Sequence, residues 1–333
     1  IRYLSGTALW ITSIIIISSS LAYTMYGGLR ASILTDNIQF LMLIILLLIS
    51  FYFLIHYNSS IFNLDFIRNN QPNLLSYNYY TNFTAGLTFF IAVSATNLFH
   101  QGNWQRVYAA KNNKVLKKSL IISFLIVIPL VFMMGFSGLV AVSYDSNLVP
   151  DLAFFSLLFK EQKVFLSLII VFLAISLTVS SIDTLINAIS SLIVVDVKHA
   201  IDYKGDSFRL SQKGVIIISI ISLIVASKGL SILYLFLLAD LFCCSAVLSV
   251  FFGFYLKHFD ERRVFYSILA GLFAGLLFFP SPDFTKSILV GIIIPIEYFP
   301  IYISQSLLFL SFIFATFLPI LFWKLNFIKK AKE

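Results

Sequence analysis

The chain has 333 residues, of which 59% are hydrophobic, 17% aromatic and 11% charged. A mean hydropathy of +0.95 excludes a soluble globular enzyme or binding module and indicates a helical membrane protein with several spans. The net charge of +8 would suit an anionic partner or a membrane surface, so the distribution of the basic residues has to decide its meaning.

Apolar segments of spanning length recur along the whole chain. A transmembrane helix needs about 20 mostly apolar residues. The sequence predicts about nine such helices, at residues 7–25, 37–56, 85–102, 119–143, 163–195, 210–227, 231–256, 263–279 and 304–323. Residues 287–300 are interrupted by Pro295, Glu297 and Pro300, and we expect a loop or an interfacial segment there. The expected fold class is therefore an all-α polytopic membrane protein.

Basic residues are distributed unequally between the two sides of these spans. Six of the 23 lie on one side: Arg2, Arg68, Lys160, Lys163, Lys228 and Lys286. The other seventeen lie on the opposite side, and the side richer in Lys and Arg is normally cytoplasmic. The sequence thus predicts a multi-pass protein of the cell membrane with its N-terminus outside and its C-terminus inside. The same bias accounts for the positive charge, and we expect no nucleic-acid partner.

The first polar stretch, YGGLRASILTDNIQF at residues 26–40, lies where the first two predicted spans meet. Gly27 and Gly28 favour a tight turn, because glycine tolerates positive φ. Asp36 follows at the expected start of the second span. Two interpretations are open for this carboxylate: it caps that helix, with Thr35 beside it, or it faces the interior of the bundle.

The second polar stretch, SATNLFHQGNWQRVYAAK at residues 94–111, begins inside an apolar helix and ends in basic residues. A glycine among so many polar side chains favours local unwinding, and irregular backbone at membrane depth survives only where it lines a cavity. The alternative is that the helix ends near Phe99 and the polar residues lie among the lipid headgroups.

The third polar stretch lies within residues 163–197, an apolar run of spanning length that carries a polar stripe. Residues at helical steps of three or four share one face; here they are Ser176, Ser180, Asp183, Thr184, Asn187 and Ser191. Hydroxyl groups alone would be consistent with close helix packing. A carboxylate near mid-membrane costs about 2.5–3.5 kcal/mol and does not help packing, so the stripe favours a site for a hard monovalent cation such as sodium.

Three motifs in this order resemble those of the sodium:solute symporter family, which includes the sodium/glucose and sodium/proline transporters. GGLRASILTDNIQ is similar to the family's GG-x-x-A-x-x-x-TD-x-x-Q junction, WQRVYAAKN to its QR-x-x-AAK stretch, and SSIDTLINAISSLIVVDV to its S(S/T)-x-D-(S/T) helix. The resemblance extends from about residue 15 to about residue 255.

The resemblance implies a partial leucine-transporter-type fold, in which two inverted five-helix repeats hold ion and substrate sites beside broken helices. Residues 1–333 would form a single transporter domain without its first core helices. Within it, residues 1–56 would end the first repeat, residues 85–256 would form the second, and residues 257–333 would supply peripheral helices and a cytoplasmic tail.

The resemblance also implies site residues. For the main sodium site it gives the hydroxyls of Ser180 and Ser181 and the carbonyl of Leu177. For a further sodium site nearer the cytoplasm it gives Asp36, with Ser180, Asp183 and Thr184 opposite it, and the Asp183-Thr184 pair leaves the number of sodium ions open. For substrate, the expected broken helix supplies Asn97, His100 and Gln101.

The function expected from the resemblance is secondary active symport of sodium with a small organic solute, such as an amino acid, sugar, urea or carboxylate. Two alternatives stay open: the transporter-like sensor portion of a membrane signalling protein, and a proton-coupled carrier that uses Asp36 or Asp183. An enzyme is not expected, because the sequence has no metal-ligand cluster and no nucleophile paired with a base. We expect no cofactor besides sodium as coupling ion, and the oligomeric state is open.

Two further features lie in the apolar run 231–256. Asp240 is a second acid inside a predicted span, and we favour helix-to-helix hydrogen bonding over a transport role for it. Cys243 and Cys244 are neighbours on a helix and point in different directions, which favours neither a disulfide nor a metal site.

Overall fold

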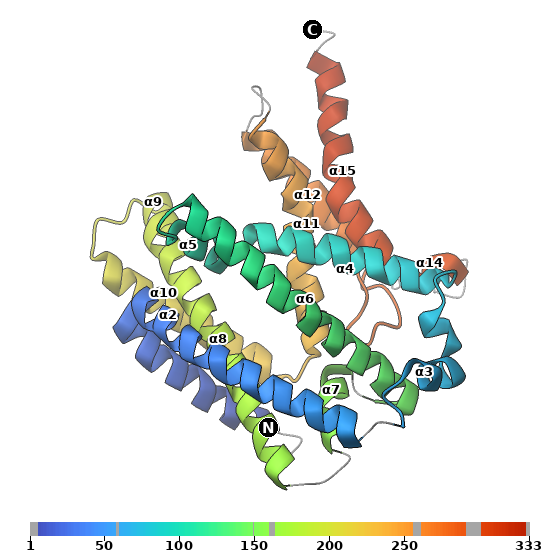
Figure 1. Ribbon diagram of the computed structural model, residues 1–333. Helices are drawn as coiled ribbons and strands as arrows, with labels where there is room; N and C mark the ends of the chain where they lie inside the picture. The colour runs from blue at the N-terminus through green and yellow to red at the C-terminus, as the bar shows by residue number, and fades with distance from the viewer. Residues whose placement is uncertain are drawn as a thin grey trace. The chain divides into compact units, whose positions relative to one another are not determined.

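The computed structural model describes residues 6–57, 60–148, 150–159, 164–255, 261–290 and 301–330. The described residues form helices and no β-strand (Figure 1). Among them, six helices are long and apolar enough to cross a membrane: Ile33–His56, Tyr80–Phe99, Asn113–Tyr144, Val164–Ala200, Ser207–Ser227 and Ile232–Tyr255. The predicted all-α membrane class is therefore confirmed. The predicted number of nine spans is not, because the helical segments Leu9–Ala22 and Leu307–Leu321 are shorter and the helix over 263–279 includes charged residues at its start.

The helices belong to two compact units. The first unit comprises residues 1–72 and 101–229, and the second comprises residues 73–100 and 230–333. In the first unit lie α2 (Leu9–Tyr57), α3 (Leu64–Asn70), α5 (Gln101–Tyr108), α6 (Asn113–Tyr144), α7 (Ala153–Phe159), α8 (Val164–Leu192), α9 (Lys198–Ala200) and α10 (Ser207–Ser227). In the second lie α4 (Tyr80–Phe99), α11 (Ile232–Gly253), α12 (Glu261–Phe278), α14 (Ile301–Gln305) and α15 (Leu307–Lys330).

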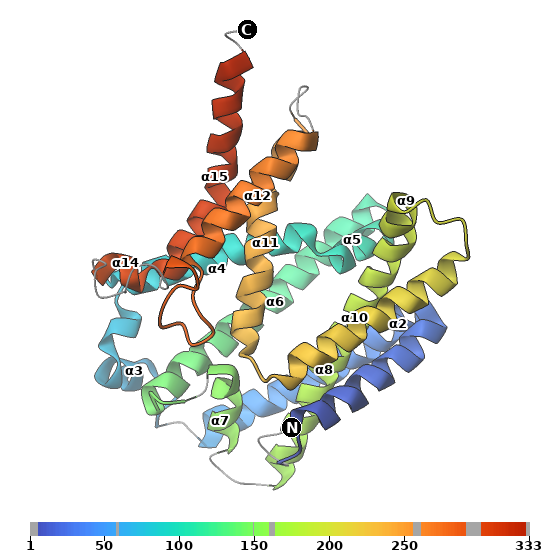
Figure 2. The ribbon, with the colours of Figure 1, turned by 180° about the vertical axis from the view of Figure 1, so that it is seen from behind.

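Helix α2 is the longest helix of the first unit and doubles back on itself (Figures 1 and 2). Thr24 and Thr35 both bind the carboxylate of Asp183. They are eleven residues apart, which on a straight α-helix would separate them by about 16 Å. The chain must therefore reverse between them, where the sequence predicts a turn. Asp36 lies one residue after Thr35, and its carboxylate contacts Ser180 and Arg106, in agreement with the interpretation that it faces the interior of the bundle.

Helix α8 lies at the centre of the first unit and packs against α2, α5, α7 and α10. Its apolar side chains Leu173 and Ile186 are buried there. At its end the chain continues as a π-helical turn, Ile193–Val197, and Ile193 packs so close to α10 that a Cβ at Gly214 would lie 2.5 Å from Ile193 Cδ1. This contact fixes the end of α8 against α10.

Two helices of the first unit begin earlier than their apolar residues suggest. The side chain of Asn112 accepts a hydrogen bond from the Val115 N–H and starts α6, where the sequence predicted a start at residue 119. Asp206 does the same for the Phe208 N–H at the start of α10. Capping side chains, rather than hydropathy, therefore set these boundaries.

The chain is unwound at His100, between α4 and α5. His100 has φ −72° and ψ 98°, which is an extended conformation, whereas Phe99 and Gln101 are both helical. The break lies inside the polar stretch for which the sequence offers two interpretations, local unwinding and a helix end near Phe99, and α4 ends at Phe99. It is confined to a single residue, and Gly102 is already part of α5.

The core of the second unit forms where α11 packs against α4, α12 and α15. Leu237, Leu241 and Phe312 are almost completely buried in it. A Cβ at Gly271 on α12 would lie 2.6 Å from the Ala315 carbonyl oxygen, so α12 and α15 touch through their backbones. Close contact through small residues is typical of helices in membranes. Most of the predicted interfacial segment at 287–300 lies outside the described residues.

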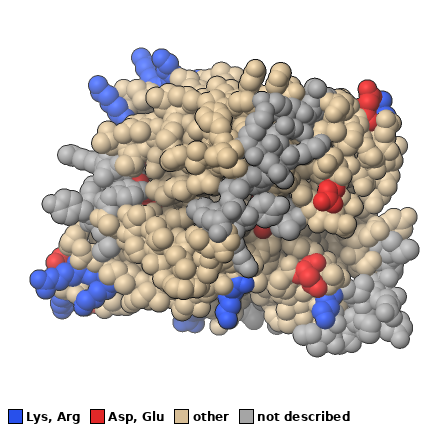
Figure 3. All heavy atoms as spheres, turned by 90° about the horizontal axis from the view of Figure 1, so that it is seen from below, with Lys and Arg blue, Asp and Glu red and all other residues tan. Residues whose placement is uncertain are grey.

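The surface is rich in exposed apolar side chains. On α6, Leu125, Val131 and Phe132 are each more than three-fifths exposed. Charged side chains occur in small groups on the face shown in Figure 3, and most of the described surface there is uncharged. Such a surface suits contact with lipid rather than with water.

Candidate functional site

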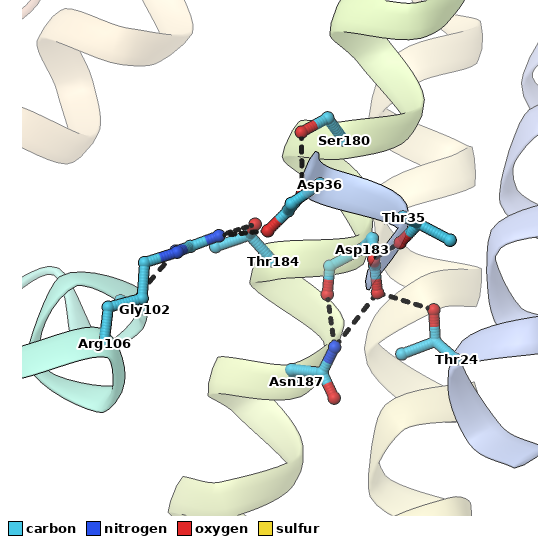
Figure 4. A network of polar contacts seen from close by, with 9 residues as sticks. All are labelled: Thr24, Thr35, Asp36, Gly102, Arg106, Ser180, Asp183, Thr184 and Asn187. Atoms are coloured by element: carbon cyan, nitrogen blue, oxygen red, sulfur yellow. Dashed lines mark hydrogen bonds and ion pairs between the residues drawn. The ribbon is translucent and has the colours of Figure 1, made fainter. Parts of the chain in front are cut away.

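The carboxylate of Asp183, on the inner face of α8, is fully buried. Its Oδ1 accepts hydrogen bonds from Thr24 Oγ1 at 2.8 Å and from Asn187 Nδ2 at 3.0 Å, and its Oδ2 accepts one from Thr35 Oγ1 at 3.3 Å (Figure 4). All three donors are neutral. Among the described residues, no Lys, Arg or His pairs with Asp183. A buried carboxylate with only neutral donors is costly unless it binds a cation or a proton.

A second carboxylate, Asp36, lies on the same side of α8 but has different partners. Its Oδ1 accepts a hydrogen bond from Ser180 Oγ at 3.0 Å, and its Oδ2 is paired with Arg106 Nη2 at 2.6 Å. The same nitrogen of Arg106 donates to Thr184 Oγ1 at 2.9 Å (Figure 4). The guanidinium group therefore joins α2, α5 and α8 at one point.

Helix α5 is held against α8 by two more side chains. Gln105 Nε2 donates to the Asn187 carbonyl oxygen at 3.2 Å, and Gln101 Nε2 donates to Ser191 Oγ at 3.4 Å. Both tethers are neutral, and the Gln101 bond is long for a hydrogen bond. The contact through Arg106, in contrast, carries charge.

The predicted sodium ligands on α8 separate onto two faces. Ser180, Asp183 and Thr184 face α2 and α5 through the contacts above. Ser181 instead donates to the carbonyl oxygen of Leu177 at 2.9 Å, and both residues are exposed. Neighbouring residues on a helix point about 100° apart, which explains why Ser180 and Ser181 reach different surroundings. The sodium roles of Leu177 and Ser181 stay predictions.

The predicted substrate residues lie on both sides of the helix break. Asn97 and His100 belong to the second unit and Gln101 to the first. Asn97 Nδ2 donates to the Val93 carbonyl oxygen at 2.8 Å. His100 Nδ1 is buried and has no hydrogen-bond partner in the described part of the chain. The substrate roles of these residues stay predictions.

Asp240 is the buried acid of the second unit. It accepts a hydrogen bond from Thr96 Oγ1 on α4 at 2.5 Å. The contact joins α11 to the last turn of α4, in agreement with the interpretation of Asp240 as a helix-to-helix hydrogen-bonding residue. Cys243 and Cys244, which follow it on α11, are free thiols.

Arg106 and Thr24 are the site residues that the sequence did not indicate. The sequence places Arg106 among the basic residues of a predicted cytoplasmic loop, and Thr24 is a single hydroxyl in an apolar run. A signal for Arg106 was present, because it is the arginine of the QR-x-x-AAK motif. Sequence alone gives no comparable signal for Thr24.

Comparison with known proteins agrees with these features. The sequence profile of the sodium:solute symporter family matches residues 1–271. This chain belongs to the sodium:solute symporter family. It is 27% identical over 273 residues to the spermidine transporter DUR31 of Candida albicans, an alignment that covers 78% of this chain and 50% of that protein. The chain thus spans about half the length of the curated relative. No solved structure matches the chain.

The family membership confirms the resemblance read from the three motifs. The family and the relative are transporters, so the expectation of a transporter rather than an enzyme is confirmed. The chain is a multi-pass membrane protein of a solute-transport family.

Proposed function

We propose that this protein is a secondary active symporter that couples sodium entry to the uptake of a small organic solute. The observation that carries the proposal is the oxygen-rich cluster between α2 and α8. Two carboxylates, Asp36 and Asp183, lie there with the hydroxyls of Ser180 and Thr184. Hard cations prefer oxygen ligands, and a carboxylate with hydroxyls offers them with little net charge.

A proton is the second candidate for the coupling ion, and Asp183 is the residue that favours it. Its carboxyl group is fully buried and accepts hydrogen bonds only from neutral donors in the described chain. A proton would remove the charge of this group as effectively as sodium would balance it. Sodium is the leading candidate because hydroxyls flank both carboxylates and the family pairs sodium with solutes.

The relative named as a spermidine transporter makes spermidine the first solute to test. Asn97, His100 and Gln101 remain the proposed substrate contacts, because the family resemblance assigns them this role. The helical conformation is interrupted at His100. Irregular backbone inside a helical bundle exposes carbonyl and amide groups that a polar solute can bind.

Uptake into proteoliposomes tests the proposal with the complete transporter. Labelled spermidine, proline, glucose and urea are each offered under an inward sodium gradient, an inward proton gradient, or no gradient. We expect a sodium gradient to drive accumulation of at least one solute above its outside concentration. Accumulation that follows only the proton gradient would reject sodium as the coupling ion and favour the Asp183 alternative.

The proposed orientation is tested by labelling single cysteines from either side of the membrane. Lys111 and Tyr77 are both exposed and lie in the predicted inner and outer connections. We expect Lys111→Cys to react only from the cytoplasmic side and Tyr77→Cys only from outside, against the background of Cys243 and Cys244. Reaction of both from one side would contradict the positive-inside assignment.

A further inference from the structure

We propose that Arg106 is a tethered cation that competes with the coupling ion for Asp36. In this mechanism, binding of the ion displaces the guanidinium group and releases α5 from α2 and α8. The inference rests on the proposed sodium coupling and adds to it a residue that links the ion to the helix break.

The first argument is geometric. One nitrogen of Arg106, Nη2, lies 2.6 Å from Asp36 Oδ2 and 2.9 Å from Thr184 Oγ1. Both atoms are predicted sodium ligands, and the other Asp36 oxygen is bound by Ser180, a third predicted ligand. The guanidinium group thus occupies the position at which oxygens from α2 and α8 converge (Figure 4).

The second argument is electrostatic. The side chain of Asp36 is 19% exposed, so water screens it poorly, and Arg106 already neutralises its charge. A sodium ion on the same carboxylate oxygen would lie within about 4 Å of the guanidinium group, where like charges repel strongly in a partly buried site. The two cations therefore exclude one another. Exchange is feasible because the side chain of Arg106 is 45% exposed and its group is weakly hydrated.

The third argument concerns what Arg106 is attached to. Helix α5 has eight residues and begins directly after His100, the unwound residue. Arg106 Nη1 also donates to the Gly102 carbonyl oxygen at 3.3 Å, so the guanidinium group contacts the first turn of α5 as well. Once Arg106 leaves Asp36, α5 loses its charged contact with α2, and the neutral hydrogen bonds of Gln101 and Gln105 to α8 remain.

Release of α5 would couple the ion to the substrate. A substrate that binds Gln101, the first residue of α5, and prefers the released position of α5 binds more tightly when sodium is present. By linkage, it must raise the affinity for sodium by the same factor. Arg106 is a positioning residue in this scheme, because it acts on the break through α5 rather than by touching substrate.

Sodium titration of substrate uptake separates this role from a structural one. The complete transporter is compared with Arg106→Gln and with Arg106→Lys. Arg68→Gln is the matched control, because Arg68 forms an exposed ion pair with Asp65 at 3.7 Å in the same unit. We expect Arg106→Gln to lower the sodium concentration for half-maximal uptake, because the competitor is gone. The factor by which sodium raises the apparent substrate affinity should be smaller in Arg106→Gln than in wild type by about fivefold or more. Fivefold is the lower end of typical coupling factors.

The other two variants provide reference values for the sodium midpoint. Arg106→Lys keeps the charge but lacks the fork that reaches Asp36 and Thr184 together, so its sodium midpoint should lie between those of wild type and Arg106→Gln. Arg68→Gln should match wild type. A rise in the sodium midpoint of Arg106→Gln, or an unchanged midpoint with unchanged coupling, would overturn the inference.

A second readout follows α5 itself and does not depend on uptake. Val107 lies beside Arg106 on α5 and is partly buried, so Val107→Cys, in a background with Cys243 and Cys244 replaced by Ser, reports its release. Sodium should speed labelling of this cysteine by severalfold, and with Arg106→Gln labelling should be fast without sodium. If sodium drives wild-type uptake but leaves labelling unchanged, the inference alone fails. If sodium affects neither, the proposed sodium coupling fails with it.

Discussion

Asp36 on α2 and Asp183 on α8 lie at the same interface between these two helices, yet their carboxylates have opposite kinds of partner. Asp36 is paired with the guanidinium group of Arg106 and is partly accessible. Asp183 is fully buried and accepts hydrogen bonds from two threonines and an asparagine. One carboxylate already has a cation from the protein, whereas the other has only neutral partners among the described residues.

The difference indicates that the two acids respond differently to a bound cation. A carboxylate held by an exchangeable guanidinium group can respond to an ion without a large change in local charge. A carboxylate with neutral donors changes the charge of a buried site whenever it gains or loses a cation. We therefore expect substitutions at Asp183 to have larger effects on transport than substitutions at Asp36.

The largest effect is expected for Asp183→Asn. The amide oxygen can still accept from Thr24 and Asn187, and the amide nitrogen can donate to Thr35, so the hydrogen bonds that hold α2 to α8 persist. Only the charge is lost. We expect ion-driven uptake to fall by about a hundredfold, which corresponds to roughly 2.7 kcal/mol of ion binding, while the amount of protein in the membrane stays near wild type.

Asp183→Ala is the control for folding. It removes the carboxylate that accepts from Thr24, Asn187 and Thr35, and a buried donor that loses its acceptor, such as Thr24 Oγ1, costs about 1–3 kcal/mol, so membrane abundance should fall as well. Uptake is measured from the accumulated labelled solute, and the amount of protein in the membrane from the fluorescence of a fused reporter in the same cells. Wild-type uptake by Asp183→Asn would show that Asp183 only joins helices.

Asp36→Asn should have a smaller but still large effect. The amide can keep bonds to Ser180 and Arg106, but the guanidinium charge is then unbalanced and repels an incoming cation. We expect the sodium concentration for half-maximal uptake to rise by between about ten- and a hundredfold. The double variant Asp36→Asn with Arg106→Gln should recover part of this loss. A double variant whose sodium midpoint is as high as that of Asp36→Asn alone would contradict competition at this position.

Ser180→Ala and Ser181→Ala test the two faces of α8. Each keeps a small residue, so helix packing should survive, but each removes an oxygen that the family resemblance assigns to sodium. We expect the sodium requirement to rise about tenfold for both, whereas Leu177→Ala should do much less because its proposed ligand is the backbone carbonyl. If only Ser180→Ala has an effect, the ion site lies with Asp36 rather than beside Ser181.

Helical periodicity accounts for what the sequence predicted of this site. Residues at steps of three and four place Ser180, Asp183 and Thr184 on one side of α8, and the structure places Asp36 against them. An interruption near Phe99 and His100 was also predictable, because polar residues follow an apolar helix there. The fold class followed from apolar segments of spanning length.

The contacts that the sequence did not predict depend on distances between helices. Periodicity along one helix carries no information on these distances. Arg106 reaches Asp36 across 70 residues of sequence, and Thr24 reaches Asp183 across 159. A long side chain near a membrane boundary can point to water or back into the protein, and sequence does not choose between them. Helix starts at Asn113 and Ser207 were missed because capping side chains lie outside the apolar runs.

The smallest effect is expected from the two threonines that bind Asp183. Thr24→Val removes a donor at 2.8 Å and Thr35→Val a donor at 3.3 Å, and a shorter hydrogen bond is the stronger one. We expect Thr24→Val to cost about 1 kcal/mol of stability and Thr35→Val less, with uptake reduced by only severalfold. The check is the thermal unfolding midpoint of each purified variant at one heating rate. Thr24 and Thr35 bind Asp183 from opposite sides of the reversal in α2, so the ranking shows which side the carboxylate holds more firmly. A larger drop in the unfolding midpoint for Thr35→Val than for Thr24→Val would contradict this ranking. It would mean that Asp183 stabilises the part of α2 next to Asp36 more than the part around Thr24, so that a change at one carboxylate affects the other.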